Sequence, residues 1–247
     1  MIRRQLLGGA LWTPSRLGAN VIAWFDAAAS TTLALSGASV TSWASRAGSI
    51  SAAPGSSPTY SATGRNGLPA VLFSGTQNLV FSANTGLPTG NAAGFSAIVA
   101  YSPDNSAFKY AISYGGFTAN DGRDIGIGAG VSFISGGGAA DINSGISWAN
   151  ADHIVVANTG SSSNALRVDG SDAGSNVTAL STGSAAGEIG ANTSGSQKWS
   201  GSIQEIVLGD RQLSASERQK LEGYLAWKWG LRGLLPSDHP YKNGRPN

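Results

Sequence analysis

The sequence predicts an all-β fold, a two-sheet antiparallel jelly-roll sandwich with one short C-terminal helix packed on it. Short apolar stretches with strand periodicity recur along the chain, and turn formers separate them, Gly alone supplying 35 of 247 residues. Charged residues make up only 12% of the chain. The hydrophobic content of 41% is enough for a packed core and excludes a disordered chain. A single helical pattern follows, near the C-terminus.

The strand patterns are clearest in the first half of the chain. Residues 21–25 form a continuous apolar run, which is typical of a buried strand. Residues 44–58 are small and polar and predict a loop. Residues 95–101 have the pattern of a central strand, and we expect residues 108–114 to pair with them across a turn. Further strands are expected at residues 33–35, 40–43, 70–73, 79–81, 125–127, 131–134, 154–157 and 166–168.

The helix is predicted from its cap and its apolar face. Ser214, followed three residues later by Glu217, forms a capping box, in which each side chain accepts a hydrogen bond from the other residue's amide. Pro236 prevents the helix from resuming after it ends. Apolar residues recur at helical spacing on one face, which we expect to pack on the outside of a sheet: Leu221, Tyr224, Leu225 and Trp229.

The stretch that carries the helix also resembles a known family. Residues 198–206, KWSGSIQEI, and residues 213–218, LSASER, resemble the end of a laminin G-like, concanavalin A-like lectin/glucanase domain. In that family an F/W-x-G-x-I-x-E strand precedes an L-s-x-x-E motif that opens a short helix. The resemblance is good over residues 150–230 and looser over residues 21–101. The ending, residues 224–241, resembles a variant found in bacteriophage and prophage virion proteins.

The resemblance implies a non-enzymatic virion protein: a capsid decoration, head-fibre or tail-associated domain, exposed on the particle surface after synthesis in the host cytoplasm. Its expected partners are other capsid or tail proteins, further copies of the chain, and a cell-surface glycan. The alternative is a free or surface-attached carbohydrate-binding module. Glycoside hydrolysis ranks third among these functions.

The expected organisation has three parts: an N-terminal arm (residues 1–18), the concanavalin A-like sandwich (19–235) and a C-terminal tail (236–247). The arm precedes the first strand pattern, so it can extend to a partner without loss of core contacts. Arginines would pair there with acidic groups of a virion protein, and leucines would fill its grooves. The alternative is a frayed terminus without a partner. The arm residues expected to make the attachment are Arg3, Arg4, Leu6, Leu7, Leu11 and Arg16.

No catalytic pair is evident in the sequence. A glycosidase needs two carboxylates at a defined separation, and the glucanase branch of the family places them on one strand as E-x-D-x-x-E. The chain has four glutamates, none with that spacing: Glu188, Glu205, Glu217 and Glu222. We therefore expect no catalytic residue and no enzyme.

Two places are candidate ligand sites. Residues 120–124 form the densest polar cluster, in which Asp121, Arg123 and Asp124 would hold a sugar hydroxyl or Ca²⁺. The alternative is an Asp-Gly hairpin turn with its charges in water. Trp148 is the best candidate for an exposed, sugar-stacking aromatic residue, and a core position is the alternative. Without a recognisable calcium loop, we expect no cofactor and no metal.

Composition excludes several other classes. The chain has no Cys, which rules out disulfides and thiolate metal sites. It has no apolar run near the ~20 residues that span a bilayer, so we expect no membrane insertion. Residues 66–197 hold three basic and eight acidic residues, and the basic residues of the two ends neither cluster nor alternate with aromatic residues. We therefore expect no nucleic-acid partner.

Overall fold

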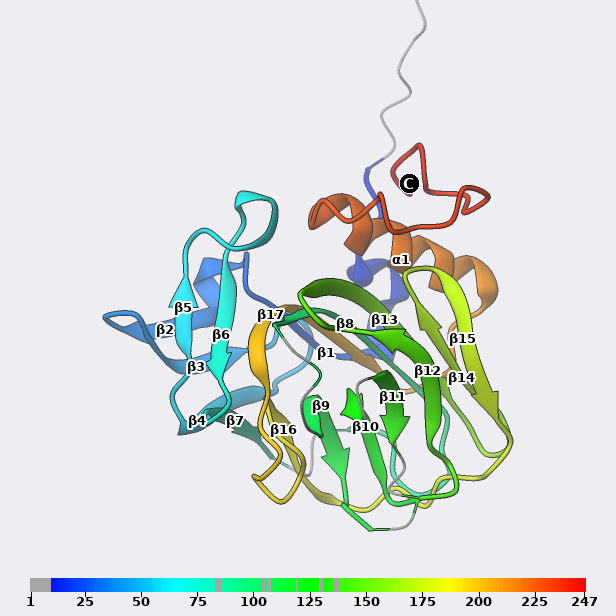
Figure 1. Cartoon of the computed structure of the whole chain (residues 1–247), viewed down its shortest axis with the longest axis horizontal. Helices are drawn as coiled ribbons and strands as arrows, with labels where there is room; N and C mark the ends of the chain where they lie inside the picture. The colour runs from blue at the N-terminus through cyan, green and yellow to red at the C-terminus, as the bar shows by residue number, and fades with distance from the viewer. Residues whose placement is uncertain are drawn as a thin grey trace, which may run out of the picture.

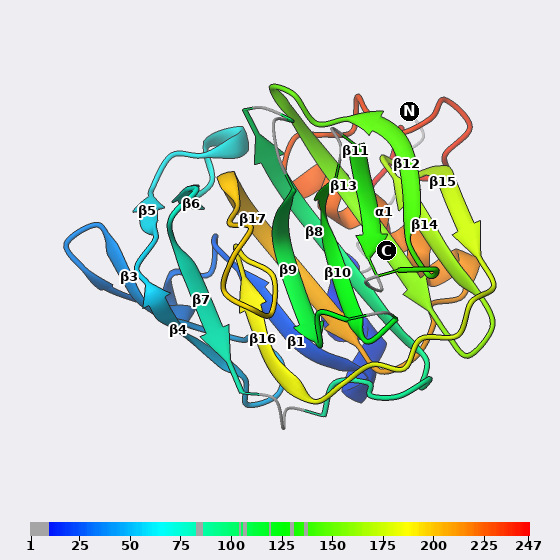
Figure 2. The ribbon, with the colours of Figure 1, turned by 60° about the horizontal axis from the view of Figure 1, so that its bottom comes forward.

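A computed structural model confirms the all-β fold with one C-terminal helix (Figure 1). It describes residues 10–82, 86–103, 105, 108–118, 120–128 and 138–247, and residues 131–135 by their backbone. The strands form two antiparallel layers, and the helix covers the outside of one of them (Figures 1 and 2). In the described part of the chain, no helix has the length and apolar character needed to cross a bilayer.

The first sheet lies against the helix. Its centre is β17 (Ser200–Gly209), which pairs with β8 (Gly94–Ser102) on one side and with β1 (Val21–Asp26) and β6 (Ala70–Ser74) on the other. The remaining strands of this sheet are β2 (Leu33–Ser36), β3 (Ser39–Ala44), β5 (Thr59–Ser61), β13 (Ala151–Thr159), β14 (Asn164–Val168) and β15 (Ser171–Asn176).

The second sheet lies on the far side of the sandwich from the helix and stands in front in Figure 2. β4 pairs with β3 of the first sheet and with β7 of the second, so it joins the two layers. The strands of the second sheet are β4 (Ser51–Ser56), β7 (Asn78–Phe81), β9 (Lys109–Gly115), β10 (Gly122–Gly128), β11 (Val131–Ser135), β12 (Ile142–Ser147) and β16 (Ala185–Ile189).

Alternation along the central strands creates two apolar cores. On β8, Ile98 and Ala100 face the second sheet, whereas Ala97 and Val99 face the helix. The first core fills the space between the sheets, and Trp43 and Trp199 are fully buried there. The second core lies between the first sheet and the helix, which explains why so many strand residues are buried on both faces.

The helix α1 (Ala215–Lys228) begins as the sequence predicts. Ser214 is its N-cap, and the reciprocal hydrogen bonds of the capping box with Glu217 are both present. Leu221 and Leu225 are fully buried against the first sheet, which confirms the predicted apolar face. Gly230 follows the helix with a φ of +69°, a left-handed conformation that glycine adopts without strain.

The motif that resembles the laminin G-like family has a physical role at three positions. Trp199 is buried between the sheets. A side chain at Gly201 would begin 1.9 Å from the carbonyl oxygen of Tyr101, so only glycine fits where β17 crosses β8. Glu205 points to the helix side and is fully buried.

Two strand predictions are wrong. Residues 108–114 do not pair with residues 95–101, because β9 belongs to the second sheet and pairs with β10 and β16, while β8 pairs with β13 and β17. The stretch expected as a loop, residues 44–58, contains β4. Its small residues leave little side-chain pattern, and its order comes from backbone pairing with two neighbours.

Both terminal segments pack on the sandwich. Residues 14–20 form a short 3₁₀ segment, and Trp12 and Leu17 are only 6% and 5% exposed in the core beneath α1. The amide of Trp12 donates to the carbonyl oxygen of Pro246 at 3.1 Å. His239 of the tail contacts the buried carboxylate of Glu222 at 3.1 Å. Residues 10–18 therefore do not form the free arm that the sequence predicts.

Candidate functional site

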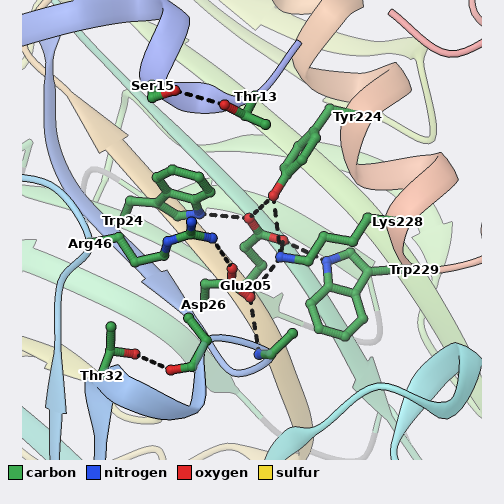
Figure 3. A network of polar contacts seen from close by, with 12 residues as sticks. Thr13, Ser15, Trp24, Asp26, Thr32, Arg46, Glu205, Tyr224, Lys228 and Trp229 are labelled. Carbon is green, nitrogen blue, oxygen red and sulfur yellow. Dashed lines mark hydrogen bonds and ion pairs between the residues drawn. The ribbon is translucent and has the colours of Figure 1, made fainter. Parts of the chain in front are cut away.

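Two buried carboxylates face each other under the helix. Asp26 ends β1 and is paired in register with Glu205 of β17, and both side chains point away from the inter-sheet core. Their exposed fractions are 1% and 0%. Burial of a carboxylate is costly unless donors or cations surround it. The side chains that do so come from β1, from the loop after β3 and from α1 (Figure 3).

Each oxygen of Glu205 accepts two hydrogen bonds. Oε1 accepts from Nε1 of Trp24 at 2.6 Å and from the hydroxyl of Tyr224 at 3.0 Å. Oε2 accepts from Nζ of Lys228 at 2.8 Å and from Nε1 of Trp229 at 2.7 Å. Burial raises the pKa of Glu205, and burial together with the Glu205 charge raises the pKa of Tyr224, so the tyrosine stays a donor.

The charges of this cluster compensate one another. Lys228 Nζ also lies 2.6 Å from Oδ1 of Asp26, whose Oδ2 binds Arg46 at 2.5 Å. Two buried carboxylates thus face two cations, Lys228 and the more exposed Arg46. The network fixes the orientation of Tyr224 and Lys228, which also form part of the surface above it.

That surface is hollowed. A pocket of about 200 Å³ opens above the network, and we call it the Trp227 pocket. Its walls come from three parts of the chain that are far apart in sequence: residues 11–13, then Tyr224, Trp227 and Lys228 of α1, and Arg245 and Pro246 of the tail. Trp12 meets Tyr224 edge to face, with ring centroids 6.2 Å apart.

Trp227 and Trp229 project from opposite sides of α1, since residues two apart are separated by about 200° around a helix. Trp229 is fully buried. Trp227 is half-buried, and its Nε1 donates to the carbonyl oxygen of Tyr241 at 2.8 Å. The guanidinium carbons of Arg232 and Arg245 lie 4.8 and 5.5 Å from the centre of the Trp227 ring. The ring is therefore fixed by the tail and flanked by positive charge.

The pocket suits a small polar ring. Three aromatic side chains, Trp12, Tyr224 and Trp227, offer apolar faces or edges, and Arg245 offers hydrogen-bond donors at the solvent side. None of the residues that line the pocket is acidic. Binding sites for small ligands combine apolar walls with a few placed polar groups in this way.

A second polar feature lies on the outer face of the second sheet. Glu188 of β16 is paired with Ser113 of β9, which is paired with Asp124 of β10, so the three side chains form one row across the strands. Burial raises the pKa of Glu188, which accepts from Nδ2 of Asn78 at 2.7 Å. Burial, and then the charges of Asp141 and Asp121, raise the pKa of Asp124 well above its usual range.

The structure separates the predicted ligand cluster. Asp121 lies in the turn before β10, where it accepts from the amide and hydroxyl of Thr118. Arg123 points inward, 2% exposed, to the hydroxyls of Thr159 and Thr182. Asp124 points outward, is 2% exposed, and its carboxylate oxygens have no hydrogen-bond partner among the described residues. Consecutive strand residues face opposite sides, which is why Arg123 and Asp124 cannot act together.

Trp148 is not an exposed platform. It is fully buried, with its ring 5.3 Å from that of Trp199 and 5.1 Å from that of His153. The alternative, a core position, is the observed one. Neither Trp148 nor Arg123 lies where it could contact a ligand at the surface.

The attachment residues expected in the arm are only partly described. Leu11 is 53% exposed and lines the Trp227 pocket, whereas Arg16 is exposed on the 3₁₀ segment and does not line that pocket. Arg3, Arg4, Leu6 and Leu7 lie outside the described residues. Their role in attachment stays a prediction.

Within the described ranges, no group of three or more acidic or histidine side chains is placed to hold a metal ion. The absence of a cofactor stays a prediction.

The pocket residues Trp12, Trp227, Lys228 and Arg245 were missed as site residues. One signal could have indicated them: Trp227 and Trp229 cannot both face the sheet, so one must be near the surface. The contribution of Trp12 and Arg245 could not be found in the same way, because only the folded chain brings its two ends together.

Comparisons with known proteins place the fold. No family model and no curated protein matches the sequence. Among solved structures, domain 4 of AbnA, a GH43 extracellular arabinanase from Geobacillus stearothermophilus, in complex with arabinotriose, has a TM-score of 0.57 at 11% identity, covering 82% of this chain and 98% of that one. The fold is a β-sandwich shared with carbohydrate-active proteins.

Two further structures are larger than this chain. A GH54 α-L-arabinofuranosidase has a TM-score of 0.60 at 15% identity, and the match covers 74% of this chain and 50% of that one. A Trypanosoma rangeli sialidase has a TM-score of 0.58 at 16% identity, covering 92% of this chain and 36% of that one. This chain therefore corresponds to a part of these proteins.

The comparisons correct one expectation and leave another without support. The expectation of no enzyme is contradicted, because the three comparison structures belong to an arabinanase, an arabinofuranosidase and a sialidase. At these identities the likeness shows the fold, and the activities are those of the proteins named. None of the three is a virion protein, so the sandwich is supported and the phage origin is not.

Proposed function

We propose that this chain is a carbohydrate-binding β-sandwich domain and that the Trp227 pocket is its saccharide site. The observation that carries this proposal is the set of three aromatic walls, Trp12, Tyr224 and Trp227, around a solvent-open hollow with Arg245 at its side. Aromatic rings contact the apolar face of a sugar ring, while nearby donors bind its hydroxyls.

Size and rigidity support the same ligand class. The pocket of about 200 Å³ is smaller than the roughly 300–1,000 Å³ of sites for drug-sized ligands, which suits a single sugar unit of a longer glycan. Its walls are fixed before binding: Tyr224 and Lys228 by Glu205, and Trp227 by Tyr241. A preformed site loses little conformational entropy when a ligand binds.

The fold adds a second line of support. Domain 4 of the arabinanase, which this chain covers almost completely, was solved with arabinotriose. A binding assay with the purified chain tests the proposal: arabinotriose and a panel of immobilised plant, bacterial and animal glycans should yield at least one ligand with saturable binding. Absence of binding across the panel and to soluble arabinotriose would contradict it.

Glycoside hydrolysis is a second candidate, favoured by the row on the second sheet. Glu188 and Asp124 lie two strands apart, roughly 10 Å between backbones, and both pKa values are raised. A raised pKa suits a general acid, and inverting enzymes separate their carboxyl groups by about 6.5–9.5 Å. Both side chains are nearly buried, at 7% and 2% exposure, which ranks this site second to the open Trp227 pocket. Reducing-sugar release that Asp124→Asn abolishes would establish this activity.

Attachment to a virion is a separate proposal, which rests on the resemblance of residues 224–241 and on the exposed Leu11 and Arg16. It predicts that the chain is recovered by mass spectrometry from purified phage particles and that a Leu11→Ala, Arg16→Ala variant is depleted there. Recovery only from particle-free secreted material would favour a free or surface-attached module.

A further inference from the structure

The Trp227 pocket has positive charge with no acidic counterpart. Arg232 and Arg245 both lie against the Trp227 ring and both are exposed. Among the described residues, neither guanidinium group has a carboxylate within ion-pair distance, and the lining of the pocket contains no Asp or Glu. A neutral sugar needs hydrogen-bond donors but does not need uncompensated charge.

The third cation of the pocket is already neutralised. Lys228 Nζ lies 2.6 Å from Asp26 and 2.8 Å from Glu205, beneath the floor of the pocket. The methylene groups of Lys228 therefore line the pocket, whereas its charge is paired in the buried network. The free charge at the pocket is that of the two arginines.

The two arginines differ in their access to a ligand. Arg245 lines the pocket, whereas Arg232 lies over the same indole but outside the lining. At 4.8 and 5.5 Å from the ring centre, both guanidinium carbons lie within cation–π range of the indole, and the N–H groups of a guanidinium lie in one plane. Their fork matches the two oxygens of a carboxylate.

We infer that the Trp227 pocket selects a sugar that carries a carboxylate, with Arg245 as the group that binds the carboxylate and the aromatic walls holding the ring. This inference rests on the proposed function and names the ligand class of the same site. Because Arg245 is exposed, its attraction for a carboxylate should weaken as the ionic strength rises. The apolar contacts between the aromatic walls and the sugar ring should not weaken in this way.

The test uses the full chain and two matched probe pairs in calorimetric titrations: trigalacturonate against galactotriose, and sialyllactose against lactose. We expect the acidic member of at least one pair to bind about tenfold more tightly, since hydrogen bonds to a charged group are the stronger ones. Raising the salt from about 0.05 to about 0.5 M should reduce that preference.

Two variants distinguish a direct contact between Arg245 and the carboxylate from a general attraction by positive charge. Arg245→Gln should lower the affinity for the acidic probe to that of its neutral partner, and Arg232→Gln, which removes the same charge from the same ring, should retain most of the acidic preference. The inference is overturned if the neutral members bind as tightly as the acidic ones, or if the preference survives in Arg245→Gln. Binding of neutral sugars alone leaves the proposed function standing, whereas failure of every saccharide overturns both.

Discussion

The indole nitrogen of Trp229 donates a 2.7 Å hydrogen bond to Oε2 of Glu205, which joins the helix α1 to the central strand β17. Three more donors, from Trp24, Tyr224 and Lys228, converge on the same carboxylate. The Trp227 pocket is built on this junction, because two of the donors also form its walls. Substitutions in the network should therefore change the stability of the fold, and substitutions in the pocket wall should change ligand affinity.

Replacement of Glu205 tests the junction. Glu205→Gln removes the charge that compensates Lys228 and leaves an amide among four donors, and removal of one partner from a buried ion pair costs about 3–5 kcal/mol of unfolding free energy. Urea unfolding measures this loss. The control is Asp172→Asn, since Asp172 pairs with Arg167 at 89% side-chain exposure and its loss should cost less than about 1 kcal/mol. Equal effects of the two substitutions would contradict the account.

The N-terminal segment is predicted to be part of the folded core. Trp12→Ala should reduce stability by about 3–5 kcal/mol, because the side chain is 6% exposed beneath α1. Its neighbour Leu11 is 53% exposed, so Leu11→Ala should change the melting temperature little. If Trp12→Ala melted like the unmodified protein, the segment would be the free arm that the sequence predicts.

The helix cap predicts an acid-sensitive step. A hydrogen bond from Arg211, opposed in part by burial, and the bonds from Ser214 lower the pKa of Glu217 to about 2. A depressed pKa in the folded state contributes stability that is present above the ordinary value of 4.5 and is lost as the pH falls toward about 2. Titration of the Glu217 carboxyl by NMR should give a midpoint near 2, and a midpoint near 4.5 would show that neither the Arg211 pair nor the cap holds the carboxylate in solution.

His153 predicts a loss of stability as the pH rises above 6.5. Both ring nitrogens face acceptors, Nδ1 at 2.6 Å from Asp169 and Nε2 at 3.1 Å from the carbonyl oxygen of Ser147. Burial opposes the charge, but the hydrogen bond and charge of Asp169 raise the pKa of His153 above 6.5. Its contribution is then fully present below 6.5 and is lost as the pH rises through the folded-state value. His153→Phe should remove this part of the pH dependence measured by thermal unfolding.

Local patterns predicted those parts of the fold that local chemistry decides. The apolar run of β1, the strand-forming residues of β8 and the capping box of Ser214 all depend on residues close in sequence. The choice of partner for β9 does not depend on nearby residues, because a turn can join two strands that belong to different sheets. β4 has few apolar side chains, so only its pairing with β3 and β7 makes it a strand.

The candidate site was beyond sequence patterns for the same reason. The predicted ligand cluster failed because adjacent residues such as Arg123 and Asp124 face opposite sides of a strand. The Trp227 pocket depends on contacts between chain ends, such as the bond from Trp12 to Pro246, that no spacing in the sequence records. The sequence pointed to Trp148 as the exposed aromatic residue, but Trp148 is buried and the half-buried Trp227 lines the pocket instead.

The most direct measurement compares ligand affinity in two variants that each remove an aromatic side chain from the surface. Trp227→Ala removes a wall of the pocket, whereas Phe117→Ala removes a ring that is 39% exposed beside Tyr110 at the second sheet. Trp227→Phe retains a ring but loses the bond to Tyr241, and melting curves show whether each variant is folded. By calorimetry with the best saccharide from the panel, Trp227→Ala should weaken binding at least about tenfold, Trp227→Phe less, and Phe117→Ala hardly at all. Unchanged affinity in a folded Trp227→Ala variant, or an equal loss in Phe117→Ala, would contradict the assignment of the saccharide site to the Trp227 pocket.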